Sequence, residues 1–153
     1  MVNAKPVSTL LASHFNLSVK QSPSTEAELK KMKKISYASA VGCLMYVMVC
    51  TRSDLAQALT VVSKYMSNLG RDHWQAVKWI LKFLKGTRNK GIMFERQHEN
   101  TCITGFIDSD YARDLNKHQF TTGYIFTCVG GPVSWRSMLQ SISALSMTEP
   151  NGL

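Results

Sequence analysis

Acidic residues are scarce in this sequence of 153 residues: 10 Asp and Glu stand against 18 Lys and Arg, which gives a formal net charge of +8. That excess suits contact with a polyanion, either nucleic acid or an anionic membrane, and the distribution of charge has to decide between them. Hydrophobic residues make up 44% of the chain and charged residues 18%, a composition that excludes a disordered protein. The length fits one ordinary domain or two small ones.

Paired cysteines and clustered histidines are also missing. The four cysteines contain no C-x-x-C spacing, so the sequence has no zinc signature. We expect reduced thiols in an intracellular protein of the cytoplasm or nucleus. Each histidine is expected to be a solvated surface residue rather than a metal ligand: His14, His73, His98 and His118.

Long apolar runs are absent as well. The first twenty residues lack the apolar stretch of a secretory signal, so we expect a protein that is not secreted. Residues 35–51 are uncharged and mostly apolar, but this stretch is shorter than the roughly 20 residues that a membrane span needs. We interpret it as a buried core helix and expect no membrane contact.

An irregular lead-in over residues 1–23 precedes a region with helical periodicity. Ser24 or Thr25 can cap a first helix, whose end carries the basic run at residues 30–34. A stretch rich in Ala, Leu, Met and Val predicts a second helix at residues 37–50.

Two further helices are expected before the pattern changes. Ser53 or Asp54 can cap the third helix, and Gly86 stops the fourth helix, which opens at Arg71. The third helix has an apolar stripe at helical spacing, made of Leu55, Leu59, Val62 and Met66.

Basic residues concentrate on one side of the fourth helix. At about 100° per residue, four of them fall within an arc of roughly 60°, and Arg88 follows in the turn. Such an arc is usually the solvated side of an amphipathic helix, and the alternative is contact with phosphates. The four residues are Arg71, Lys78, Lys82 and Lys85. For the aromatic residues of this helix, Trp74, Trp79 and Phe83, core packing is favoured over stacking on bases.

After the fourth helix, the spacing of hydrophobic residues changes from the helical period to that of strands. A short strand is predicted at residues 91–95, and a polar loop follows at residues 97–101. Gly130 and Gly131 signal a hairpin turn within this part. Three further strands are expected at residues 102–108, 123–128 and 132–135. The fold class is therefore α+β, with a lead-in at 1–23, a helical region at 24–90 and a sheet region at 91–153.

Several motifs in fixed order resemble the Pol polyprotein of copia-type LTR retrotransposons. They lie at residues 3–9, 37–56, 73–78, 84–87 and 105–112. Their order resembles the passage from the end of the reverse transcriptase into ribonuclease H. The resemblance implies a thumb-like helical bundle followed by an incomplete ribonuclease H-like antiparallel sheet. The Tyr-x-Asp-Asp turn of a polymerase active site has no counterpart in the sequence.

The resemblance also assigns two acids. Asp108 matches the first catalytic acid of ribonuclease H and Glu149 matches the second, where the family binds Mg²⁺ or Mn²⁺. Without the resemblance, an aspartate that closes a strand is more often a turn residue or a cap. Pro150 departs from the family by stopping the helix that should hold Glu149. Asp110 and Asp114 are expected to be solvated loop acids.

We therefore expect a fragment of a Pol polyprotein that is catalytically inactive alone and at most binds nucleic acid. The partner would be an RNA–DNA hybrid or another duplex, bound weakly and without sequence preference. One alternative is a ribonuclease H module that is active only with its missing C-terminal segment, and another is a functionless pseudogene product. Three strands without completing helices should leave an apolar face and a bare edge uncovered.

Overall fold

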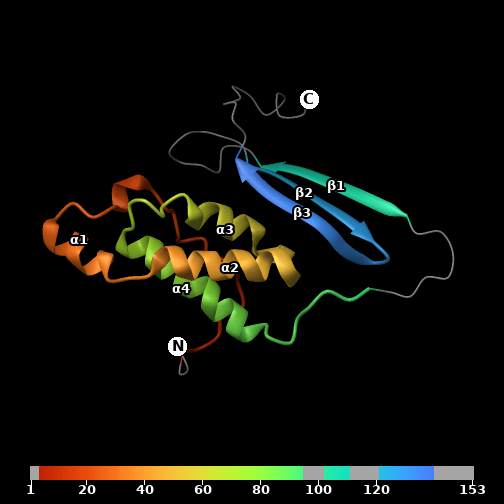
Figure 1. The fold of residues 1–153 in the computed structure, drawn as a ribbon, viewed down its shortest axis with the longest axis horizontal. Helices are drawn as coiled ribbons and strands as arrows, with labels where there is room; N and C mark the ends of the chain where they lie inside the picture. The colour runs from red at the N-terminus through yellow and green to blue at the C-terminus, as the bar shows by residue number, and fades with distance from the viewer. Residues whose placement is uncertain (1–3, 95–101, 111–120, 140–153) are drawn as a thin grey trace.

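The helices come first along the chain and the sheet comes last, so the fold class is α+β, as predicted (Figure 1). The computed structural model describes residues 4–94, 102–110 and 121–139. The helices are α1 (Glu26–Lys33), α2 (Tyr37–Thr51), α3 (Ala56–Ser63) and α4 (Arg71–Gly86). Two short 3-10 helices, η1 (Val19–Gln21) and η2 (Ser53–Leu55), lie between them. The strands are β1 (Ile103–Asp110), β2 (Thr121–Cys128) and β3 (Gly131–Leu139).

Local capping explains where α1 begins. The Thr25 hydroxyl accepts a hydrogen bond from the backbone N–H of Glu28 at 3.3 Å, so Thr25 rather than Ser24 is the cap. Glu26 and Glu28 lie in the first turn and lysines fill the last turn, as the helix dipole favours. None of the residues of α1 is buried, so this helix depends on caps and charges more than on packing.

The uncharged helix α2 buries only one side. Tyr37, Val41 and Leu44 face the core, whereas Tyr46 keeps 73% of its surface exposed and Val49 keeps 64%. The interpretation of residues 35–51 as a buried core helix was therefore wrong for the outer face. Without charged residues, its composition could not mark which side lies against α3 and α4.

The core lies among α2, α3 and α4. The fully buried side chains include Leu44, Leu55, Leu59, Val62 and Ile80. The stripe predicted for the third helix is confirmed except at its end, because α3 stops at Ser63 and Met66 is exposed. The predicted caps of this helix are wrong: its N-cap position is Leu55, which makes no side-chain cap hydrogen bond.

His73 contradicts the expectation of a solvated histidine. It is fully buried on α4 and stacks on the Tyr65 ring, with the ring centroids 3.9 Å apart. The Gly70 N–H donates to Nδ1 at 2.9 Å, so Nε2 carries the proton and donates to the Ser18 carbonyl at 3.1 Å. Burial lowers the pKa of His73, because a charged imidazole would lose its hydration. His14 is exposed, as expected, and His98 and His118 lie outside the described residues.

The sheet is antiparallel, with strand order β1-β2-β3. Asp108 pairs with Gly123, and Ile125 pairs with both Phe106 and Trp135. The three predicted strands are confirmed, and each is longer than its predicted range.

The turn between β2 and β3 differs from the prediction by one residue. Val129 and Gly130 form it, with φ values of 51° and 74°, and Gly131 already belongs to β3. Positive φ at both central residues is what a two-residue hairpin turn of type I′ requires. Val129 adopts that conformation despite its branched side chain, which disfavours it.

The strand predicted at residues 91–95 is absent from the part that the structure describes, residues 91–94. This segment packs on the sheet instead of pairing with it. A Cβ on Gly131 would lie 2.8 Å from the Phe94 ring, so glycine permits the close approach.

The sheet rests on the helices through β3, which lies beside α3 (Figure 1). The Thr60 hydroxyl is 3.0 Å from the Ser137 carbonyl and links the two elements. In the described residues β1 pairs only with β2, and it exposes 69% of Ile103, 57% of Phe106 and 78% of Ile107. The outer strand thus shows the uncovered apolar surface that the sequence predicts.

No single helix in the described ranges has the length and apolarity to cross a membrane. Taken together, α1 and α2 meet those criteria, but they are bent by 46° relative to each other.

Candidate nucleic-acid interface and carboxylate site

The basic residues of α4 line two neighbouring hollows. Arg71 and Lys78 line a cleft shared with α1, and Lys82 lines a hollow beside the lead-in. Gln75 borders both. The opposite side of α4 buries Ala76, Val77 and Ile80. The predicted arc is therefore the outer side of an amphipathic helix, and its cations follow one another along a continuous surface.

Two of the predicted phosphate-binding residues differ in their surroundings. The Lys85 ammonium donates to the Ala4 carbonyl at 2.9 Å, so it holds the lead-in against the end of α4. Arg88 is exposed in the turn that follows α4. Lys85 thus has a structural task that the helical arc could not reveal.

Three of the α4 cations keep their charge uncompensated by close carboxylates. Among the described residues, Arg71, Lys78 and Lys82 form no ion pair. Acids are nevertheless near: Glu28 lines the cleft of Arg71 and Lys78, and Asp72 lines the hollow of Lys82. The residues that line the cleft of Arg71 and Lys78 remain net positive, whereas Lys82 and Asp72 balance each other in the second hollow.

The aromatic residues of α4 pack, as the sequence favoured. The Trp79 indole N–H donates to the Thr9 carbonyl at 2.9 Å, and its ring meets Phe15 edge-on at 5.7 Å. Trp74 meets Tyr37 in a similar edge-on contact, with centroids 6.2 Å apart. Phe83 lies under the guanidinium of Arg52, 5.5 Å from the ring centroid.

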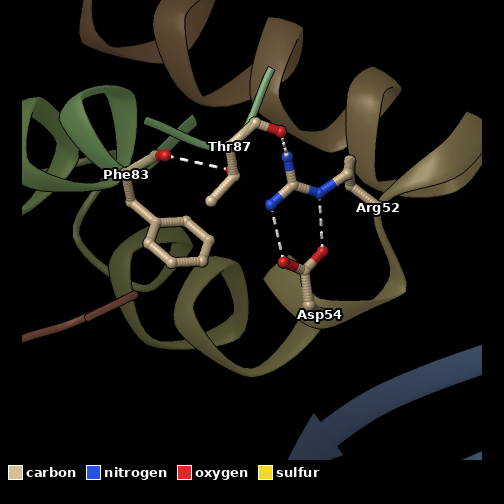
Figure 2. Close-up of polar contacts among 4 residues, drawn as sticks. All are labelled: Arg52, Asp54, Phe83 and Thr87. Carbon is tan, nitrogen blue, oxygen red and sulfur yellow. Dashed lines mark hydrogen bonds and ion pairs between the residues drawn. The ribbon is translucent and has the colours of Figure 1, made fainter. Parts of the chain in front are cut away.

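Arg52 joins the end of α2 to the end of α4, and sequence reasoning missed it (Figure 2). Its Nε and one terminal nitrogen donate to the two carboxylate oxygens of Asp54 at 2.9 and 2.7 Å. The other terminal nitrogen donates to the Thr87 carbonyl at 3.4 Å. Arg52 is buried, with 7% of its surface exposed. The hydrogen bonds that Arg52 donates to Asp54 raise the pKa of Arg52, so the guanidinium stays charged.

This arrangement explains why Asp54 is no helix cap. Both of its carboxylate oxygens accept from Arg52, so they are not directed at the backbone of α3. The sequence signal was the pair Arg52 and Asp54 at a helix break, but nothing local indicates the partners Phe83 and Thr87.

Asp108 is exposed on β1 and lines an open cavity of about 400 Å³ between the sheet and η2. Asp54 and Arg136 line the same cavity. Asp110 is the last residue of β1 and not a loop residue. Glu149 and Asp114 lie outside the described residues.

These residues do not complete a metal site within the described ranges. Carboxylate oxygens suit Mg²⁺ and Mn²⁺, but Asp54, the other acid of the cavity, is already held by Arg52. No group of three or more His, Cys, Asp or Glu residues in the described part could hold a metal ion. The described ligands therefore do not fit a two-metal centre.

Comparison with known proteins gives three informative relatives. A retrovirus-related Pol polyprotein from transposon TNT 1-94 of Nicotiana tabacum is 50% identical over 149 residues, 97% of this chain. The corresponding polyprotein from transposon RE2 of Arabidopsis thaliana is 34% identical over the same length. A secreted RxLR effector protein of Plasmopara viticola is 45% identical over 118 residues, 77% of this chain and 82% of the effector.

The chain spans 11% of the tobacco polyprotein and 10% of the Arabidopsis polyprotein. No family model matches it. No solved structure matches it either. The identity to both polyproteins covers nearly the whole chain and includes the helices and the sheet. Over nearly its whole length the chain therefore corresponds to a segment of the retrovirus-related Pol polyproteins from transposons.

Proposed function

We propose that this segment is the part of a Pol polyprotein in which the last helices of the reverse transcriptase run into ribonuclease H. The order of elements supports the proposal, since a helical bundle precedes an antiparallel sheet whose first strand carries Asp108. The motifs that resemble copia-type polyproteins fall on these elements in the same order. In this role the segment positions nucleic acid and performs no chemistry by itself.

The observation that carries the proposal is the outer side of α4. Arg71, Lys78 and Lys82 lie on one side of a helix and form no ion pair with a described residue. Cations placed in this way contact phosphates of a duplex without reading its sequence. We expect weak binding of an RNA–DNA hybrid.

The test is the salt dependence of binding, measured by fluorescence anisotropy of a labelled RNA–DNA hybrid. Three phosphate contacts should give a log–log slope near −2.7, at roughly −0.9 per contact. The triple variant Arg71→Gln/Lys78→Gln/Lys82→Gln should flatten the slope. The matched control, Lys30→Gln/Lys33→Gln/Lys34→Gln, removes the same charge from α1 and its C-cap position and should keep the slope. Equal slopes for the two variants would show that α4 is only a solvated face.

The proposal includes the absence of ribonuclease H activity from this chain. Two-metal hydrolysis needs several carboxylates that hold cations about 3.5–4 Å apart. Asp108 is the one acid of its cavity that is not bound to Arg52 within the described residues. A labelled hybrid incubated with the protein and Mn²⁺ should stay intact, whereas cleavage that Asp108→Asn abolishes would contradict the proposal.

One observation favours a second candidate, a nuclease module that needs a complementing segment. Asp108 is exposed at an open cavity, where further ligands could approach it. Hybrid cleavage that appears when the following ribonuclease H segment of a Pol polyprotein is added, and that disappears with Asp108→Asn, would establish this candidate.

A further inference from the structure

A cleft between α1, the segment around η1 and α4 is larger than the other hollows described above. Its volume is about 750 Å³, which lies within the range of roughly 300–1,000 Å³ typical of ligand sites. Segments far apart in sequence build it, because Lys20 belongs to η1, Lys31 belongs to α1, and Arg71 and Lys78 belong to α4. We call it the α1–α4 cleft.

The α1–α4 cleft is strongly positive. Four cations line it, and none of them forms an ion pair with a described residue: Lys20, Lys31, Arg71 and Lys78. Glu28 is the only carboxylate among its described lining residues, and one of its oxygens accepts from the Ser24 N–H at 3.3 Å. A concave surface with one sign of charge concentrates the field and attracts a polyanion.

The cleft also has an aromatic wall. Trp74 lines it while meeting Tyr37 edge-on at 6.2 Å, so the indole is held from the core side. An anchored indole beside several cations is the combination by which proteins bind single-stranded nucleic acid, because the ring stacks on a base while the cations meet phosphates.

We propose that the α1–α4 cleft binds nucleotides of a single strand, with phosphates at its four cations and a base against Trp74. The inference rests on the proposed function, in that the chain contacts nucleic acid, but it assigns a different ligand and further residues. In a duplex the bases are paired and stacked inward, so they do not reach an indole in a cleft. Lys20 and Lys31 belong to the cleft and not to the outer side of α4, which separates the two surfaces experimentally.

The first test compares a labelled oligo-dT strand with the RNA–DNA hybrid, using the full chain. Lys20→Gln/Lys31→Gln should weaken binding of the strand about tenfold, since each lost contact is worth up to about a factor of five. The same variant should leave hybrid binding within about twofold, because α4 keeps its cations. Lys33→Gln/Lys34→Gln removes equal charge outside the cleft and should leave strand binding nearly unchanged.

The outcomes separate the two proposals. If the α4 triple variant loses hybrid binding while Lys20→Gln/Lys31→Gln binds the hybrid normally, the result supports the outer side of α4 as the duplex-binding surface. If both double variants weaken strand binding equally, the effect is one of net charge and the cleft assignment is wrong. If the strand does not bind while the hybrid does, this inference fails and the proposed function stands.

The second test asks whether a base is recognised. An abasic strand of the same length keeps the phosphates, and it should bind at least about fivefold more weakly if one base stacks on Trp74. Trp74→Leu should abolish that difference, with thermal unfolding followed by circular dichroism to confirm that the variant folds. Equal affinity for the normal and abasic strands in the unmodified protein would overturn the base contact and leave only a general polyanion site.

Discussion

Removing the carboxylate of Asp54 should destabilise the helical part of the protein more than any surface charge does. The Arg52 side chain is only 8% exposed, and two of its nitrogens donate hydrogen bonds to the carboxylate of Asp54. Breaking a buried pair by removing one partner costs about 3–5 kcal/mol, because a charge is left without its partner. Asp54 is 46% exposed, so water can partly replace it. For Asp54→Ala we therefore expect a loss of about 2 kcal/mol.

The assay is urea unfolding followed by far-UV circular dichroism, with a double-mutant cycle. Arg52→Met removes the charge and keeps much of the aliphatic packing against Phe83, so it should cost less than Asp54→Ala. The double variant Arg52→Met/Asp54→Ala should be more stable than the sum of the single losses predicts, since the two residues share one interaction.

The matched control is an exposed ion pair of the same chain. Lys30 and Glu26 lie 3.3 Å apart with 75% and 83% of their side chains exposed. Lys30→Ala should cost less than about 0.5 kcal/mol, because water screens such pairs. If Asp54→Ala were no more destabilising than Lys30→Ala, burial would not be what gives the Arg52 pair its strength.

Three further predictions concern single features of the fold. Burial depresses the pKa of His73 below its ordinary value of 6.5, and the carbonyl of Ser18 only partly opposes this. The unfolded chain therefore binds a proton first as the pH falls. The stability that His73 contributes should be fully present above about pH 6.5 and should decline as the pH falls towards its folded-state pKa, and His73→Gln should reduce this slope of unfolding free energy against pH. Val129→Gly should raise the melting temperature slightly, because glycine adopts a positive φ without the strain that a branched side chain causes. A lower melting temperature would argue against strain at this position. Hydrogen exchange should find the amide of Phe106 less protected than that of Leu81, because β1 is an exposed outer strand.

Elements with local signals could be predicted from the sequence. Thr25 supplies a cap and Gly86 an end, and the apolar positions of α4 repeat at helical spacing, so these boundaries follow from neighbours in the chain. The uncharged α2 lacks such contrast, and its buried side was decided by the elements packed on it. Residues 91–94 have the composition of a strand, yet here Phe94 packs against Gly131 instead of pairing with a strand, and no local signal indicates that contact.

In the candidate sites too, features with a local sequence signal were predictable, and features that depend on distant partners were not. The basic arc of α4 follows from helical geometry alone and was predictable. The partners of Arg52 were not, because Thr87 lies 35 residues further along the chain and contributes only a backbone carbonyl. The α1–α4 cleft likewise unites Lys20 with Arg71 through folding, and no sequence spacing between them indicates a shared site.

Net charge is therefore an incomplete guide to where a polyanion binds. Arg52 and Lys85 both belong to the basic surplus, but the first is bound to Asp54 and the second to the Ala4 carbonyl, so both stabilise the fold. Cations with these tasks have already exchanged much of their hydration for protein contacts, and a phosphate would have to compete with those contacts. Arg71 and Lys78 form no ion pair with a described residue and face a cleft that water can fill. An incoming phosphate there replaces water alone, which is why nucleic-acid contact should concentrate on this side of α4.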